Sequence, residues 1–283
     1  MEMNRCEICF DPPENCSHVC KGLDCKSYET CHRRISPVIR ITKKCTQKCD
    51  HCCFSCSPNE DEMMTIKTAS KIKKFYESNN ILSMNIMGGE FFCNYDWEDV
   101  CEELVSTKDL MYVRITSNGD WAGSDKTAKK VIDFCKRNPV VYVAVSKDKW
   151  HTNRHVDKAV ELLYDNKISM VGGKGENNED DSIVPVGNGQ FIYGFYSSFG
   201  CMCHKPDCKY KMMIDEDGEI YKCPMGIWEF DNVDNFQKGG FAPRFKEFYG
   251  KFESVFMGNC SCCLRGYERY GSKARKNAKV KVK

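Results

Sequence analysis

Several features that would place this chain in other classes of protein are missing from its 283 residues. No run approaches the roughly eighteen apolar residues of a membrane-spanning helix, and the start of the chain lacks the basic and then apolar stretch of a signal peptide. Basic residues number 42 and acidic residues 40, so the net charge is only +2. Such an even balance of positive and negative charge does not favour binding to nucleic acid or to an anionic membrane. We therefore expect no membrane anchor. Binding partners have to be inferred from local motifs and not from the overall charge.

Cysteine is abundant by contrast, with 21 residues. A secreted disulfide framework usually belongs to a shorter chain that carries an export signal. The composition therefore favours metal–sulfur ligation in a reducing cytoplasm. The chain is long enough for one large domain, or for a domain with a smaller appendage.

Apolar alternating segments occur at 38–42, 82–87, 111–116, 140–145 and 168–171, and the last four start 29, 29 and 28 residues apart. Helical patterns lie between them, and Thr65, Asp96 and Ser124 are the expected N-caps of the first three. Strand–helix units of this length predict a parallel sheet, and five or six units between about Pro37 and about Gly194 predict an open partial barrel. Ligands bind at the carboxyl ends of the strands in such sheets, so the residues directly after each strand are candidates for function.

Three cysteines follow the first strand, in the sequence Cys45-Thr-Gln-Lys-Cys49-Asp-His-Cys52. Three thiolates on so short a loop can bind three irons of a four-iron cluster and leave the fourth iron open to a substrate or cofactor. A structural zinc site, or a set of reduced surface thiols, is the alternative, because a Cys-x-x-Cys pair is common in zinc modules.

Polar turns close the next three strands. Gly88-Gly89-Glu90 follows the second strand; its glycines allow a close backbone approach, and its carboxylate can accept a hydrogen bond from an ammonium group. Ser117-Asn118-Gly119 follows the third strand and Ser146-Lys147-Asp148 the fourth. A further glycine-bearing stretch, Val184-Pro-Val-Gly187-Asn-Gly189, comes later in the chain.

Together these motifs resemble the signature of radical S-adenosylmethionine (SAM) enzymes. The resemblance implies an α/β fold with a (β/α)6 half-barrel core over residues 37–198, in which Cys45, Cys49 and Cys52 bind a [4Fe-4S] cluster. The amine and carboxylate of SAM chelate the open iron in that family, and the reduced cluster splits SAM into methionine and a 5′-deoxyadenosyl radical. This radical removes a hydrogen atom from the substrate. The resemblance also implies an electron donor such as flavodoxin or ferredoxin.

The same resemblance assigns the residues that bind SAM. The Gly-Gly-Glu motif would bind the SAM amine, and the turns after the third and fourth strands would meet its ribose and carboxylate. Gly187 would lie near the adenine, although Asn188 and Gly189 depart from the Gly-Arg-Ala of the family. His51 stands where the family usually has an aromatic residue that packs against SAM. The expected SAM contacts are Gly88, Gly89, Glu90, Ser117, Asn118, Ser146, Asp148, Gly187 and His51.

A second group of cysteines follows residue 199, where the strand–helix rhythm stops. Cys208 and Cys223 flank a predicted hairpin whose turn is 215–218, and Cys260 and Cys263 form a Cys-x-x-Cys pair. Four thiolates can complete a closed cluster, although zinc would satisfy the same ligands. This region, 199–270, resembles the auxiliary-cluster domain called SPASM, and more closely its shortened form, the twitch domain. The resemblance implies an auxiliary [4Fe-4S] cluster bound by Cys208, Cys223, Cys260 and Cys263, with Cys262 as a competitor for one place.

The remaining cysteines have no assigned partner. Cys201 and Cys203 lie just before the auxiliary site and are candidate donors of a hydrogen atom to a product radical. A cysteine-rich extension, residues 1–36, matches no known pattern and is a candidate site for a further cluster or zinc, with ligands among Cys6, Cys9, Cys16, Cys20, Cys25 and Cys31. The basic segment 271–283 is expected to be disordered.

These interpretations predict a cytoplasmic enzyme that abstracts hydrogen from its substrate and passes an electron to an auxiliary cluster. A peptide or protein is the leading substrate. Dehydrogenation or epimerisation of a small polar molecule, such as an amino sugar, a cyclitol or a nucleotide, is the alternative. A non-enzymatic zinc protein that binds nucleic acid is the hypothesis from another class, but it does not explain why three motifs close the strands of one sheet.

Overall fold

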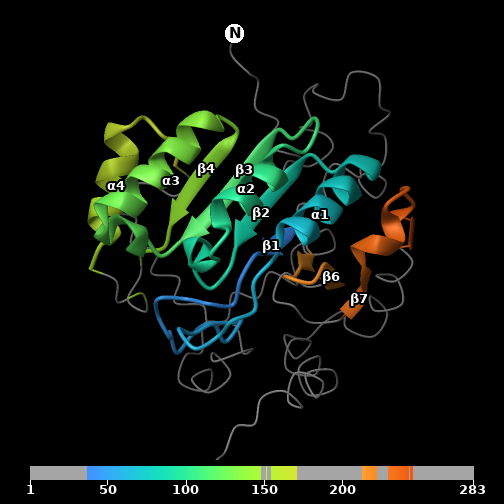
Figure 1. Cartoon of the computed structure of the whole chain (residues 1–283), viewed down its shortest axis with the longest axis horizontal. Coiled ribbons are helices and arrows are strands. Elements are labelled where there is room, and N and C mark those ends of the chain that lie inside the picture. Colours follow the sequence, from blue (N-terminus) through green and yellow to red (C-terminus); the bar gives the residue numbers. More distant parts are fainter. Residues whose placement is uncertain are drawn as a thin grey trace, which may run out of the picture.

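The computed structural model describes residues 37–147, 151, 154–170, 212–221, 229–241 and 243–244. Strands and helices alternate in the first part, in the order β1 (Val38–Arg40), α1 (Ile66–Ser78), β2 (Ser83–Met87), α2 (Trp97–Val105), β3 (Tyr112–Ser117), α3 (Asp125–Arg137), β4 (Val141–Val145) and α4 (Val156–Asp165). Three short strands follow, β5 (Met213–Ile214), β6 (Glu219–Tyr221) and β7 (Glu229–Asn232). The 3-10 turns are η3 (Phe91–Cys93), η4 (Asp120–Gly123) and η9 (Val233–Phe236). Figure 1 shows the α/β arrangement that the sequence predicts.

The described strands form one mostly parallel sheet in the order β4-β3-β2-β1-β5-β6-β7. A parallel bridge between Val143 and Met170 places the predicted fifth apolar segment next to β4. The predicted hairpin is confirmed, because β5 and β6 pair antiparallel and Gly218 takes a left-handed φ of 85° in their turn. Its first strand also pairs parallel with β1, so the hairpin extends the edge of the core sheet. No helix in the described ranges is long and apolar enough to cross a membrane.

The predicted helix starts are also confirmed. Thr65 accepts a hydrogen bond from the Thr68 amide at the start of α1, and Ser124 accepts one from the Thr127 amide at the start of α3. These bonds satisfy amides that have no partner inside the helix. Asp96 precedes α2 without such a bond.

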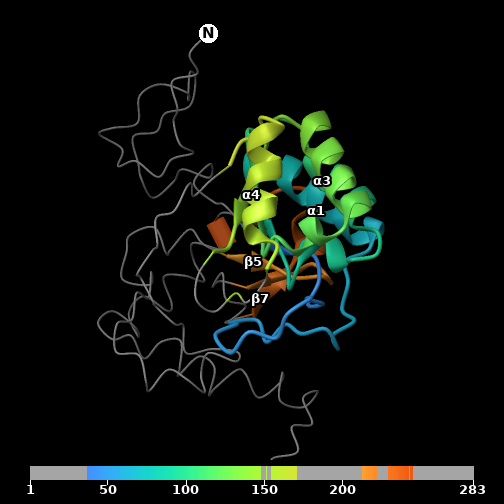
Figure 2. The same cartoon turned by 90° about the vertical axis from the view of Figure 1, so that its left-hand side faces the viewer.

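The two faces of the sheet carry different side chains. The helices cover one face, where Ile39, Ile86 and Val143 are at most 1% exposed (Figures 1 and 2). Side chains alternate between the faces of a strand, so their sequence neighbours project from the second face. Strand register places half-buried Asn85, Arg114 and Tyr142 side by side there, on β2, β3 and β4. We call these three residues the polar row.

Arg40 on β1 forms a buried ion pair with the hairpin. Its Nε and Nη2 atoms each donate a hydrogen bond of 2.8 Å to the carboxylate of Glu216, which lies in the hairpin turn. The neighbouring Asp215 lies 4.0 Å from Nη2 and accepts a 2.9 Å bond from the Tyr221 hydroxyl. The ring of Phe54, from the cysteine loop, lies 5.5 Å from the guanidinium carbon. This network ties the first strand to both the hairpin and the cysteine loop.

Replacing Arg40 with methionine is expected to lower the free energy of unfolding by about 3 to 5 kcal/mol, because Glu216 would stay buried without its partner. Adding Glu216→Met removes both charges, so the double variant is expected to regain most of that loss. Urea unfolding of the metal-free proteins measures both effects. A single variant as stable as the parent would contradict the buried ion pair.

Candidate metal centre and cofactor site

The three cysteines of the Cys-x3-Cys-x2-Cys motif lie on the loop after β1, at one end of the sheet (blue in Figure 1). Backbone bonds close this loop: the Cys45 amide donates to the Ser57 carbonyl at 3.1 Å, and the Cys52 amide to the Cys49 carbonyl at 3.2 Å. Cys45 is 8% exposed, while Cys49 and Cys52 are half-buried. All three are reduced, as ligands must be.

Hydrogen-bond donors point at two of the three sulfur atoms. The Asn118 side-chain amide lies 3.8 Å from Cys45 Sγ, and the Cys56 backbone amide lies 3.4 Å from Cys52 Sγ. Donors of this kind stabilise thiolates and tune iron–sulfur clusters. No three His, Cys, Asp or Glu side chains in the described ranges converge as the ligands of a single ion would. Three thiols on one short loop, with hydrogen-bond donors at two of their sulfur atoms, are the donor set that the SAM-binding [4Fe-4S] cluster takes, so the chemistry of the loop fits the expected group.

The thiols of the loop differ in how easily they ionise. Burial raises the pKa of Cys45 to about 12. The hydrogen bond from the Cys56 thiol lowers the pKa of Cys52 to about 6. Ligation of iron by Cys45 therefore has to displace a tightly held proton, which makes assembly of the cluster dependent on pH.

The glycines after β2 let the chain approach the cysteine loop. A Cβ atom on Gly89 would lie 2.3 Å from the Lys44 carbonyl oxygen, and one on Gly88 would lie 2.9 Å from that of Thr42. The Gly89 amide donates to the Thr42 carbonyl at 2.8 Å, and the Glu90 amide to that of Lys44 at 2.9 Å. We expected the glycines to admit a ligand; in the structure, their nearest neighbour is the backbone that leads into the first cysteine.

Glu90 links the turns after β2 and β3. Its carboxylate is fully buried and accepts hydrogen bonds from the Ser117 hydroxyl at 2.7 Å and the Asn118 amide at 2.6 Å. Asn118 in turn donates from its side chain to Thr46 Oγ1 at 3.1 Å. Three of the predicted motifs are therefore joined in one hydrogen-bonded chain. Ser146 extends it, because its amide donates to the Ser117 carbonyl at 2.8 Å.

Burial raises the pKa of Glu90 to about 8, against the hydrogen bonds that lower it. The folded protein thus binds the Glu90 proton more tightly than the unfolded chain does. The stabilisation from this proton is complete below about pH 4.5 and is lost as the pH rises through about 8. We expect metal-free protein to lose on the order of 3 kcal/mol of stability between about pH 5.5 and pH 8 through this group. Glu90→Gln should remove that part of the pH dependence, as urea unfolding at the two pH values would measure. Parallel pH profiles for the two proteins would contradict the shift.

Other residues that support the site were not predicted. The Asn94 side-chain amide donates to the carbonyls of Ile41 and Met64, at 3.0 and 2.9 Å, and so holds together the two ends of the cysteine loop. Trp121 is 1% exposed and donates from its indole nitrogen to Ser117 Oγ at 3.1 Å. Neither residue belongs to a motif, so no local signal in the sequence points to them.

The histidine of the cysteine loop contacts a second histidine. The ring centroids of His51 and His151 lie 5.0 Å apart in an edge-to-face arrangement. This places His151 beside the cysteine loop. The following predicted site residues lie outside the described ranges: Asp148, Gly187, Cys201, Cys203, Cys208, Cys223, Cys260 and Cys263.

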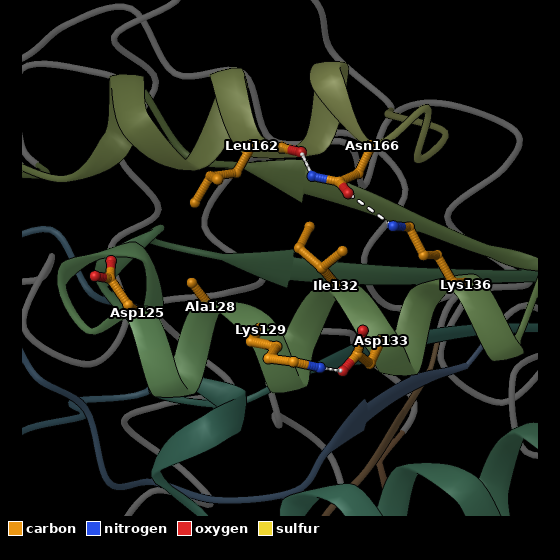
Figure 3. Close-up of a pocket in the computed structure, with 8 residues that line it drawn as sticks. All are labelled: Asp125, Ala128, Lys129, Ile132, Asp133, Lys136, Leu162 and Asn166. Carbon is orange, nitrogen blue, oxygen red and sulfur yellow. Dashed lines mark hydrogen bonds and ion pairs between the residues drawn. The ribbon is translucent and has the colours of Figure 1, made fainter.

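A surface pocket between α3 and α4 is separate from this site (Figure 3). Lys129 and Asp133 pair along one side of it, and Lys136 donates to Asn166 across it at 2.7 Å. None of the residues that line it belongs to the turns or the cysteine loop.

Comparison with known proteins agrees with this geometry. The family model described as the Radical SAM superfamily matches residues 39–184. The putative peptide biosynthesis protein YydG of Bacillus subtilis (strain 168) is 26% identical over 114 residues, which are 40% of this chain and 35% of that protein. The match therefore spans about a third of the relative's length.

Two solved structures share the fold. BtrN in complex with AdoMet and 2-DOIA has a TM-score of 0.53 at 14% identity, covering 76% of this chain and 85% of that one. Native anSMEcpe with bound AdoMet has a TM-score of 0.50 at 15% identity, covering 75% of this chain and 80% of that one. The family model spans more than half of the sequence and includes the cysteine loop and the turns after β2, β3 and β4. The chain therefore belongs to the radical SAM superfamily.

Proposed function

We propose that this protein is a radical SAM enzyme that abstracts a hydrogen atom from a peptide. Cys45, Cys49 and Cys52 would bind the [4Fe-4S] cluster that membership of the superfamily implies. The observation that carries this proposal is the link from Glu90 through Asn118 to Thr46 and Cys45, which gathers the expected SAM-binding turns beside the cysteine loop. When bound, the cluster and SAM supply a 5′-deoxyadenosyl radical that removes hydrogen from the substrate.

The turns of the chain would orient SAM against the cysteine loop. Glu90 would accept a hydrogen bond from the SAM amine, and Ser117, Asn118 and Ser146 would bind its ribose and carboxylate. Asn118 already donates toward Cys45 Sγ, so the same turn would fix both a cluster ligand and SAM. His51 would pack against SAM, and its ring contact with His151 would limit its motion.

The substrate would bind on the second face of the sheet. The helix-covered face is filled by apolar side chains, whereas the second face carries the half-buried polar row and the ion pair of Arg40. Ligand sites in open parallel sheets lie at the carboxyl ends of the strands, where the turns are. A substrate on this face would therefore lie next to SAM.

An auxiliary [4Fe-4S] cluster bound by Cys208, Cys223, Cys260 and Cys263 completes the proposal. Its support is the hairpin, whose β5 pairs with β1, the strand that leads into the first cysteine loop. Cys223 follows β6 by two residues. The auxiliary cluster would accept the substrate electron, and Cys201 or Cys203 would be the donor if a hydrogen atom is returned.

Iron and sulfide analysis of anaerobically reconstituted protein tests the auxiliary cluster. The parent should hold about eight or more irons per chain, and the double variant Cys208→Ala, Cys223→Ala about four fewer. Equal iron contents near four would contradict an auxiliary cluster at these residues and leave the SAM-binding cluster in place.

The relative YydG, named a putative peptide biosynthesis protein, supports a peptide substrate. To test the peptide assignment, an extract of bacteria grown in heavy water is separated into a peptide fraction and a low-mass metabolite fraction. Each fraction is then incubated with reconstituted enzyme, SAM and dithionite. Deuterium should enter 5′-deoxyadenosine from the peptide fraction. Transfer from the metabolite fraction alone would favour the small-molecule alternative, and transfer from neither would contradict the assignment to peptides.

A further inference from the structure

One arginine on the second face of the sheet has no partner among the residues that the structure describes. Arg114 lies in the middle of the polar row on β3, next to Asn85 on β2 and Tyr142 on β4. Its side chain is half-buried, and its Nε atom is buried without a hydrogen bond. No carboxylate of the described ranges forms an ion pair with it.

Arg40 shows what a satisfied arginine looks like on the same face. Its guanidinium makes two 2.8 Å bonds to Glu216, with Asp215 nearby. Buried charges in folded proteins are normally paired, and a buried donor left without a partner calls for an explanation. A functional role is a common explanation, since strained and unpaired groups concentrate at binding sites.

We propose that Arg114 binds a carboxylate of the substrate, and that the substrate peptide therefore carries an acidic side chain or a free C-terminus near the carbon that reacts. This inference rests on the proposed function, because it takes the second face as the substrate side. The guanidinium fork matches a carboxylate with two parallel hydrogen bonds.

The position of Arg114 suits that role. Residues 115–117 continue β3 from Arg114 to the Ser117-Asn118 turn, where SAM is expected, so about three residues or 10 Å of strand separate the two. Asn85 and Tyr142 flank the arginine in register on the two neighbouring strands, so its surroundings on this face are polar. One unpaired positive charge balances the single negative charge of a carboxylate but leaves a phosphate dianion in excess, so we assign a carboxylate.

The test is the melting temperature of the reconstituted full-length protein with SAM, titrated separately with four ligands: the α-amide of N-acetyl-L-glutamate (side-chain carboxylate only), N-acetyl-L-glutamine (α-carboxylate only), the neutral α-amide of N-acetyl-L-glutamine, and inorganic phosphate. We expect a saturable rise with one of the two carboxylates, which tells whether an acidic side chain or a free C-terminus is bound, a smaller rise with phosphate and none with the neutral α-amide of N-acetyl-L-glutamine. Arg114→Gln should abolish the rise, and Arg114→Lys should keep part of it. Without ligand, Arg114→Gln should melt at or above the parent, since it removes an unpaired charge, whereas Arg40→Met should melt well below it.

Three results would overturn the inference. One is an Arg114→Gln variant that melts as low as Arg40→Met, which would mean that Arg114 has an acidic partner within the chain. The second is a carboxylate response that is absent or survives in Arg114→Gln, and the third is a larger response to phosphate. A protein could bind the carboxylate through Arg114 and yet release no 5′-deoxyadenosine. That result would support the inference about Arg114 and contradict the proposed function.

Discussion

Cys45→Ala protein is expected to release 5′-deoxyadenosine from SAM only at assay background. Because enzymes accelerate their reactions by roughly 10⁶-fold or more, the loss should exceed about 10³-fold. Cys45 is one of the three thiols of the Cys-x3-Cys-x2-Cys motif that are proposed to bind the SAM-binding cluster, so its removal leaves two of these ligands. Iron content should fall, and mass spectrometry with dithionite and SAM measures the product.

Cys53→Ala is the matched control, because Cys53 lies on the same loop as a half-buried, reduced thiol outside the ligand motif. It should keep the iron and the 5′-deoxyadenosine of the parent. The metal-free Cys45→Ala protein should also melt close to the parent, since the substitution removes one small atom from the loop. If Cys53→Ala lost the reaction and Cys45→Ala kept it, the ligand assignment would be wrong.

Gly89→Ala has the second large expected effect, this time on folding. Its new Cβ would lie 2.3 Å from the Lys44 carbonyl oxygen and 2.7 Å from that of Lys43, and both are backbone atoms that cannot rotate away. Either the backbone of Lys43 and Lys44, which leads into the cysteine loop, or the turn after β2 must shift, at a cost of about 3 kcal/mol or more. Urea unfolding should show the loss in metal-free protein, and reconstituted protein should bind less iron.

Gly240→Ala is the control for this variant. A Cβ there meets nothing within 4 Å, although its φ of 85° is unfavourable for alanine. The expected loss is only about 1 kcal/mol, from backbone strain, with normal iron binding. Equal losses for Gly89→Ala and Gly240→Ala would mean that close packing of the turn on the cysteine loop is not what requires the glycine.

The strands, helices and turns of the core were predictable because local signals agree with the tertiary structure. Thr65 and Ser124 start helices by the hydrogen bonds that their side chains favour, and the apolar alternation of each strand matches its helix-covered face. Each motif directly follows a strand, and the carboxyl ends of parallel strands lie at one edge of the sheet. The sequence therefore also predicted that the motifs lie close together.

The contacts between motifs were not predictable, because they depend on pairs far apart in the sequence. Nothing in the local pattern indicates that Arg40 pairs with Glu216 or that β5 lies beside β1. For the same reason, Glu90 was expected to bind SAM, whereas the structure shows its carboxylate accepting bonds from Ser117 and Asn118. Its contact with SAM stays a prediction.

The most direct test of the central claim is the reductive cleavage of SAM by the parent protein, purified without oxygen and reconstituted with iron and sulfide. Addition of dithionite and SAM should yield 5′-deoxyadenosine and methionine in equal amounts, and neither product should form without the reductant. Colourless protein that binds zinc in place of iron and leaves SAM intact would contradict the account and favour the zinc-protein alternative.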